Sequence, residues 1–272
     1  MITLQHTLVS LLAMQGDEKR LRDEVPYILL PDAIRRYLGP RQYSHFEVSH
    51  DGTDVSWVKY PEDIKGMSKE TLAGAKKHMV AEVKPCVLGE ETIVSAFEEH
   101  NDHLSPIYYA GTKKHLVQDH IFDDFVRQNI DCSRMYEDKF VFQGQEYDGK
   151  GIRKVIADFE AHGLYMLAYM LYDSFGITAN QDWFDQNVKV QLDANYSKDL
   201  SDGTYGYMRI PEEINKWITE HDWSHLGEGT LSNADYIKMY QDVIDQMVLI
   251  DMERADKEKK LSEQPKGPGS GE

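Results

Sequence analysis

Residues 107–129, IYYAGTKKHLVQDHIFDDFVRQN, carry the strongest helical pattern of the chain and decide its fold class. Their apolar side chains recur at intervals of three and four residues, which is the period of an amphipathic helix. Pro106 precedes the segment, and proline is favoured at the first position of a helix. A second apolar-rich segment at 151–175 has the same character and is the expected centre of a bundle. Together the two segments predict an all-α fold.

Shorter periodic segments extend this interpretation to most of the chain. Further helices are expected at residues 3–15, 32–38, 68–83, 90–100, 183–192, 211–220 and 233–253. Residues 138–150 predict a loop or a small hairpin, because Phe140 and Phe142 stand two positions apart. No repeat or linker divides residues 1–254, whereas the polar residues 255–272 predict a disordered tail. The expected architecture is a single-domain helical bundle over residues 1–254.

The composition limits the class of protein. The chain has 272 residues, 41% of them hydrophobic, which is enough to bury a core. Its net charge of −17 argues against general nucleic-acid binding, because such a protein repels a polyphosphate backbone. Cys86 and Cys132 are too few for a disulfide framework. Neither a signal peptide nor a stretch of ~20 apolar residues is found, so no membrane span and a cytoplasmic location are expected.

A histidine and an aspartate four residues apart give the first indication of chemistry. On a helix, His115 and Asp119 project from one face, with their Cβ atoms about 5–6 Å apart. An imidazole and a carboxylate at that distance can bind one zinc-type ion, and the second carboxylate oxygen can bridge to another ion. A simple buried hydrogen bond between the two side chains is the alternative. The pair alone does not distinguish these readings.

Three earlier residues strengthen the metal interpretation. His6 lies in the first expected helix, Asp32 follows a proline at a helix start, and His45 stands in the stretch Tyr-Ser-His-Phe. The order His, Pro-Asp, Ser-His-Phe and HxxxD resembles the zinc-dependent phospholipase C family and the related single-strand-specific nucleases. The resemblance extends over residues 1–130 and is carried by LLPDAIRRYLGPRQYSHFE and YYAGTKKHLVQDHIFDDFV.

The resemblance implies a ligand set and an activity. Members of that family are all-helical and hold several zinc ions. Asp32, His45, His115 and Asp119 would form one four-ligand Zn²⁺ site, and His6 would join the second oxygen of Asp119 on a neighbouring ion. Asp119 or Asp32 would act as the catalytic base in hydrolysis of a small-molecule or lipid phosphoester. Oligomeric state is left open.

The sequence departs from the family in two respects. Secreted members use a processed N-terminal amine as a ligand, but no processing site precedes His6, so no such amine is expected. A second motif of the form HxxxE or HxxxD is not found soon after Asp119. The substitutes considered for it are His120, Asp123, Asp124, His162 and the pair His221 and His225. Of these, His162 is taken as a metal ligand.

Two other functional classes compete with this one. An HD-type metal-dependent phosphohydrolase needs an adjacent His-Asp pair, for which His50-Asp51 and His221-Asp222 are the candidates. Neither pair is followed by a helical aspartate at a suitable place. A helical interaction protein with one structural metal, or none, is the third reading. Metal content discriminates among the three, because the first predicts more than one zinc ion for each chain.

Overall fold

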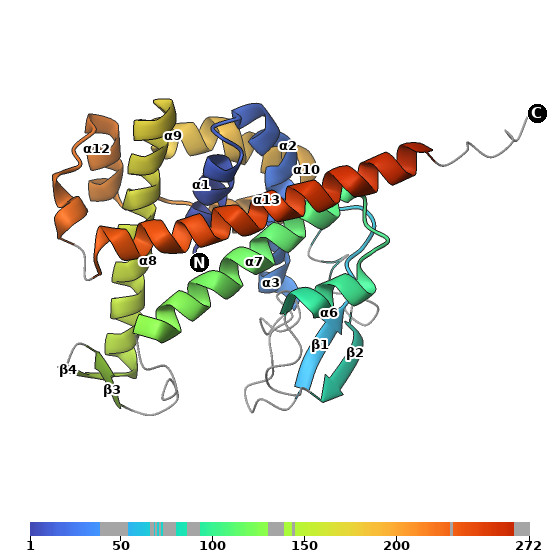
Figure 1. Ribbon diagram of the computed structural model, residues 1–272, viewed down its shortest axis with the longest axis horizontal. Helices are drawn as coiled ribbons and strands as arrows, with labels where there is room; N and C mark the ends of the chain where they lie inside the picture. Colours follow the sequence, from blue (N-terminus) through green and yellow to red (C-terminus); the bar gives the residue numbers. More distant parts are fainter. Residues whose placement is uncertain are drawn as a thin grey trace, which may run out of the picture.

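The computed structural model describes residues 1–38, 54–65, 68, 70, 72, 80–85, 93–129, 139–142, 145–228 and 231–263. Packed helices form the body of the molecule, and two small hairpins lie at its margin (Figure 1). The prediction of an all-α fold is confirmed. Among the helices described, none combines the length and the apolar character that a membrane crossing requires.

Three helices form the N-terminal part of the chain: α1 (Thr3–Ala13), α2 (Glu18–Ile28) and α3 (Leu30–Leu38). Every residue of α1 is buried, so this helix lies inside the bundle. Gln15 and Gly16 both have positive φ and turn the chain into α2, whose first turn is capped by the Asp17 side chain. The polar residues of α1 are therefore held in the interior.

Two long helices, α7 (Pro106–Asn129) and α13 (Asn233–Glu263), pack against each other, and α7 also packs along α2. Gly111 permits the close approach of α7 to α2, because a Cβ atom there would lie 2.6 Å from the Cβ of Tyr27. The shorter α6 (Ile93–His100) precedes α7. In Figure 1 the C-terminal end of α13 extends beyond the other helices.

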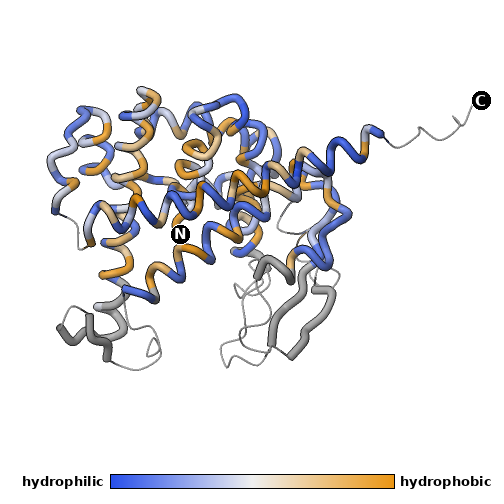
Figure 2. The backbone as a smooth tube through the Cα atoms, viewed as in Figure 1, coloured by the Kyte–Doolittle hydropathy of each residue, from blue (hydrophilic) through white to orange (hydrophobic). Residues whose placement is uncertain are grey.

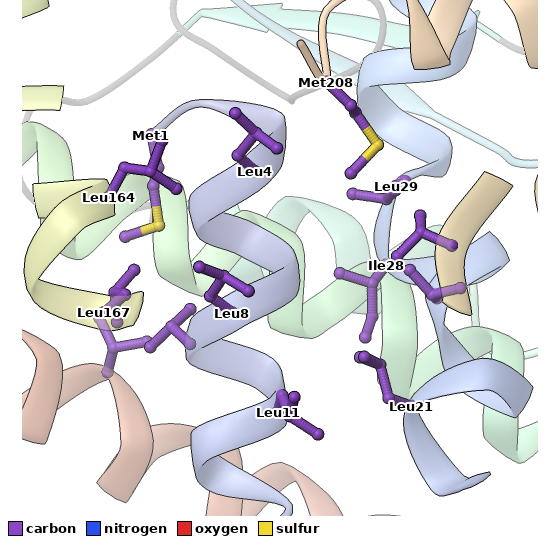
Figure 3. Close-up of a cluster of buried hydrophobic side chains, with 14 of the residues drawn as sticks. Met1, Leu4, Leu8, Leu11, Leu21, Ile28, Leu29, Leu164, Leu167 and Met208 are labelled. Atoms are coloured by element: carbon purple, nitrogen blue, oxygen red, sulfur yellow. The ribbon is translucent and has the colours of Figure 1, made fainter. Parts of the chain in front are cut away.

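The other long helix, α8 (Gly149–Phe175), packs against α1, and shorter elements follow it. These are α9 (Gln181–Phe184), a π-helical turn (Asp185–Lys189), α10 (Val190–Asn195), α11 (Lys198–Tyr205), α12 (Glu212–Glu220) and a 3₁₀ turn (Ser224–Gly227). Apolar residues recur along the inner helices (Figure 2) and meet in one core. Figure 3 shows Leu4 and Leu8 of α1 between Leu164 of α8 and Ile28 of α2.

The two hairpins are antiparallel. Strand β1 (Asp54–Val58) pairs with β2 (Val80–Pro85), and β3 (Lys139–Phe142) pairs with β4 (Gln145–Asp148). The small hairpin expected within 138–150 is confirmed, with Phe140 opposite Tyr147. The helix expected over 68–83 is wrong at its end, because residues from Val80 onward pair as β2.

Other boundaries also differ from the sequence prediction. The helices α2 and α11 were not expected, and Pro26 lies inside α2, where proline usually signals a helix end. Helix α13 continues past the expected boundary at residue 255 as far as Glu263. Ion pairs four residues apart, Arg254–Glu258 and Lys259–Glu263, support this extension.

Candidate metal centre

The packing of α1 and α7 brings two histidines into direct contact. The imidazole rings of His6 and His115 are stacked, with 3.9 Å between ring centroids and 19° between planes. Both side chains are completely buried. His6 comes from the N-terminal part of α1 and His115 from the middle of α7, so helical backbone positions both rings.

Asp119 lies one helical turn after His115, and its carboxylate faces the Nε2 atoms of both stacked rings. Its Oδ2 is 3.5 Å from Nε2 of His115, and its Oδ1 is 3.2 Å from Nε2 of His6. The two oxygens therefore point to different histidines, which is the arrangement expected of a bridging carboxylate. The amino group of Met1 also donates to Oδ1, at 2.9 Å. This contact differs from the expectation that no N-terminal amine would lie near His6.

Asp32 joins this group from the first turn of α3. One ligand atom each from His6, Asp32 and His115 lies within 4.8 Å of the others, close enough to share one cation. The Thr3 hydroxyl donates to Oδ2 of Asp32 at 2.9 Å and orients the carboxylate. We call His6, Asp32, His115 and Asp119 the histidine cluster. Two imidazoles and two carboxylates are a donor set that suits zinc.

The environment of His6 favours the neutral imidazole. Burial lowers the pKa of His6 below its ordinary value of 6.5, and the adjacent His115 acts in the same direction. Asp119 opposes both effects but does not outweigh them. A neutral ring keeps a nitrogen lone pair, which a metal ion requires and a bound proton would block.

Gln118 is a site residue that the sequence prediction did not include. Its Oε1 is 2.5 Å from Nδ1 of His6, the ring nitrogen on the side away from Asp119. Metal-bound histidines commonly hold their other ring nitrogen by such a contact. The position between His115 and Asp119 on α7 was visible in the sequence, but an amide there has no distinguishing pattern.

The remaining predicted ligands are not brought to this group by the described residues. His45 lies outside the part of the chain that the structure describes. His162 has its Nε2 3.2 Å from Oδ1 of Asn233 and its ring against Tyr236, in a separate place on α8. Burial lowers the pKa of His162 as well. Whether it binds a metal remains a prediction.

The other histidine motifs have local partners of their own. His120 faces Asp124 one turn further along α7, with 3.6 Å between Nε2 and Oδ2. His221 stacks on Tyr172, whereas His225 stacks on Trp217 and contacts Glu228. The two histidines of this motif thus belong to an aromatic cluster on the surface of α8 and α12. Their ring partners differ, which does not favour a shared ion.

The two adjacent His-Asp pairs considered for an HD-type metal centre do not form one among the described residues. His50 and Asp51 lie outside the described residues. Asp222 accepts hydrogen bonds from the backbone and hydroxyl of Ser224, and these bonds close a tight turn after α12. An HD-type centre would need this carboxylate to face a metal together with His221.

Comparison with known proteins adds no further candidate, since no family model, curated protein or solved structure matches the chain.

Proposed function

We propose that this protein is a zinc-dependent hydrolase of phosphoesters, with small-molecule or lipid substrates, and that the histidine cluster is its catalytic centre. The observation that supports the proposal is the convergence of His6, Asp32 and His115 from three separate helices to within 4.8 Å. Asp119 completes the group from the same helix as His115. His45 is proposed as a further ligand by the resemblance of the sequence, and His162 as a substitute for the downstream ligand motif that the sequence lacks.

Charge and burial favour a cation in this group over a set of simple hydrogen bonds. Asp32 and Asp119 contribute two negative charges to a largely buried space, and the amino group of Met1 supplies one positive charge. A divalent cation would be attracted to both carboxylates and could use the nitrogen lone pairs of both histidines.

When bound, zinc acidifies a coordinated water and neutralises charge on phosphoryl oxygens. The chain itself supplies orientation and proton transfer. Asp119, which faces Nε2 of both His6 and His115, orients the two imidazoles. Asp32 is half-buried and thus the most accessible member of the histidine cluster, so it is the candidate that accepts the proton of the attacking water.

A structural metal is the second candidate, and one observation favours it. His6 and His115 are both completely buried, which is typical of ligands in a closed site that stabilises a fold. Such a site would bind zinc without turnover. The two candidates share a metal and differ in reactivity, so one experiment separates them.

The test is hydrolysis of activated phosphomonoesters and phosphodiesters by the full chain reconstituted with zinc. We expect activity that a chelator abolishes and that Asp119→Asn lowers by at least about 100-fold, because the amide cannot bridge as a carboxylate does. Asp124→Asn is the matched control on the exposed side of the same helix, and it should retain activity. Zinc-loaded wild type without activity on any substrate would favour the structural candidate instead.

A further inference from the structure

Gln118 connects three parts of the interior through a single buried amide. The side chain is fully buried on α7, and its Oε1 contacts Nδ1 of His6 at 2.5 Å. Its Nε2 donates to Oγ of Ser10 at 2.9 Å and to Sδ of Met247 at 3.2 Å. The amide thus links α1, α7 and α13 beside the histidine cluster.

The partners of this amide determine which way it points. The Ser10 hydroxyl lies 2.6 Å from the carbonyl oxygen of His6, which can only accept, so the hydroxyl proton is directed there. Toward Gln118, Ser10 therefore acts as an acceptor. The thioether of Met247 is also an acceptor. Two acceptors at one end of the amide require the NH₂ group there, and this leaves the carbonyl oxygen toward His6.

The amide orientation in turn determines the tautomer of His6. Because Oε1 of Gln118 can only accept, Nδ1 of His6 must carry the proton of the neutral ring. Nε2 then presents its lone pair, and this atom lies 3.2 Å from Oδ1 of Asp119. The opposite tautomer would donate from Nε2 to Asp119 and would need the amide of Gln118 to be reversed. Reversal of the amide would direct the carbonyl oxygen of Gln118 at the sulfur of Met247, which is also an acceptor.

We propose that Gln118 is a positioning residue, which holds His6 in the tautomer whose Nε2 is available to a metal ion. The inference rests on the proposed function, because it assigns Gln118 a role toward the same metal. A neutral amide suits this role, since a carboxylate at the same place would add a third negative charge to Asp32 and Asp119. Ser10 and Met247 accept hydrogen bonds from the NH₂ group of Gln118 and so fix the orientation of the amide.

The tautomer is measured directly by two-dimensional ¹H–¹⁵N NMR of the metal-free full chain labelled at histidine nitrogens. The His6 signals are assigned by their loss in His6→Asn. We expect a protonated Nδ1 and an unprotonated Nε2 in the wild type. A wild type with its proton on Nε2 overturns the inference, whatever the metal affinity, and this measurement requires no substituted Gln118.

Zinc affinity of Gln118 variants tests the consequence. Removal of a partner that orients a metal-bound histidine weakens metal binding about 10- to 100-fold, and we expect that loss in Gln118→Leu. Gln118→Glu retains an acceptor for Nδ1 and should restore the tautomer. Thr112→Val is the matched control, because it replaces another buried polar side chain of α7, one that contacts Tyr27 and not His6. Its affinity should stay within about twofold of wild type.

The outcomes separate this inference from the proposed function. Zinc-binding wild type whose Gln118→Leu variant binds as tightly overturns the positioning role alone. Wild type that binds no zinc overturns the proposed function and the positioning role together. A loss of affinity equal in Gln118→Leu and Thr112→Val would show that general packing, and not the acceptor at Nδ1, controls the site.

Discussion

Lys114 and His115 are neighbours on α7 and are both completely buried, yet they belong to two polar clusters of opposite character. Lys114 turns toward α2 and α13, where its Nζ is 2.6 Å from Oε2 of Glu24 and 2.6 Å from Oδ1 of Asp251. His115 turns toward α1 and the carboxylate of Asp119. One helix thus carries a buried cation and a candidate cation site on adjacent residues.

In the cluster around Lys114, the charged side chains pair with one another. Arg20 contacts both Glu24 and Asp251, and Arg254 contacts Glu24 at 2.7 Å. We call Arg20, Glu24, Lys114, Asp251 and Arg254 the ion-pair cluster. Three cations face two carboxylates there, so each buried carboxylate has cationic partners within the chain. Nothing in this arrangement calls for an added ion.

The second cluster has the opposite balance. In the histidine cluster two carboxylates meet two imidazoles, one of which is kept neutral by burial. Imidazole nitrogens and carboxylate oxygens are the ligand atoms that zinc takes in proteins. The contrast teaches that burial of polar groups is not itself a sign of function. What distinguishes the candidate metal site is the convergence of two imidazoles and two carboxylates.

Breaking the ion-pair cluster should give the largest effect on stability. Glu24→Gln leaves Arg20 and Lys114 with Asp251 as their remaining carboxylate in the ion-pair cluster, so we expect a loss of about 3–5 kcal/mol in the free energy of unfolding. Denaturant unfolding measures it. Zinc content should not change. Glu258→Gln removes the exposed partner of Arg254 and should cost at most about 1 kcal/mol. Equal costs for the two variants would contradict the account of a buried network.

Breaking the histidine cluster should have a smaller effect that depends on zinc. Zinc at 100 times its dissociation constant stabilises a folded protein that binds it by about 2.7 kcal/mol, and we expect this gain in the wild type. His115→Ala should lose the gain, because a ligand is missing. Thermal unfolding with and without zinc measures the difference. If zinc stabilises His115→Ala as much as the wild type, the imidazole is not a ligand.

Acid should destabilise the metal-free protein through His6, which is the smallest of these effects. Because folding lowers the pKa of His6 below 6.5, the unfolded chain binds a proton at pH values where the folded chain does not. The contribution of the neutral His6 ring to the free energy of unfolding is therefore fully present above pH 6.5, and it is lost as the pH falls toward the lowered pKa of His6. Melting temperatures between pH 7.5 and 5 should fall less in His6→Asn. His120→Asn, at an exposed position, should follow the wild type.

The core of the candidate site was predictable because it depends on local geometry. A spacing of four residues on a helix places His115 beside Asp119 whatever else the chain does, and the structure confirms that contact at 3.5 Å. The resemblance also placed His6 next to Asp119, and in the structure Nε2 of His6 lies 3.2 Å from Oδ1 of that residue. Gln118 was not predicted, since its role appears only when Ser10 and Met247 are seen beside it.

The errors in the fold come from signals that tertiary structure overrides. Pro26 interrupts the helical signal of α2 in the sequence, but the helix forms and is stabilised by packing against α7. Residues Val80–Pro85 are long enough for either a helical turn or a strand, and pairing with β1 decides. The ion-pair cluster was beyond prediction for a different reason. Lys114 and Asp251 are far apart in sequence, and no local pattern marks them as partners.

Zinc content of the purified chain tests the central claim most directly. After saturation with zinc and exhaustive dialysis, elemental analysis should find at least one ion for each wild-type and Glu24→Gln chain, and less than a tenth of that in His115→Ala. This result would show that the histidine cluster beside Lys114 is a metal site and that the neighbouring ion pairs are not part of it. Wild type that retains no zinc, or His115→Ala that retains as much as wild type, would contradict the account.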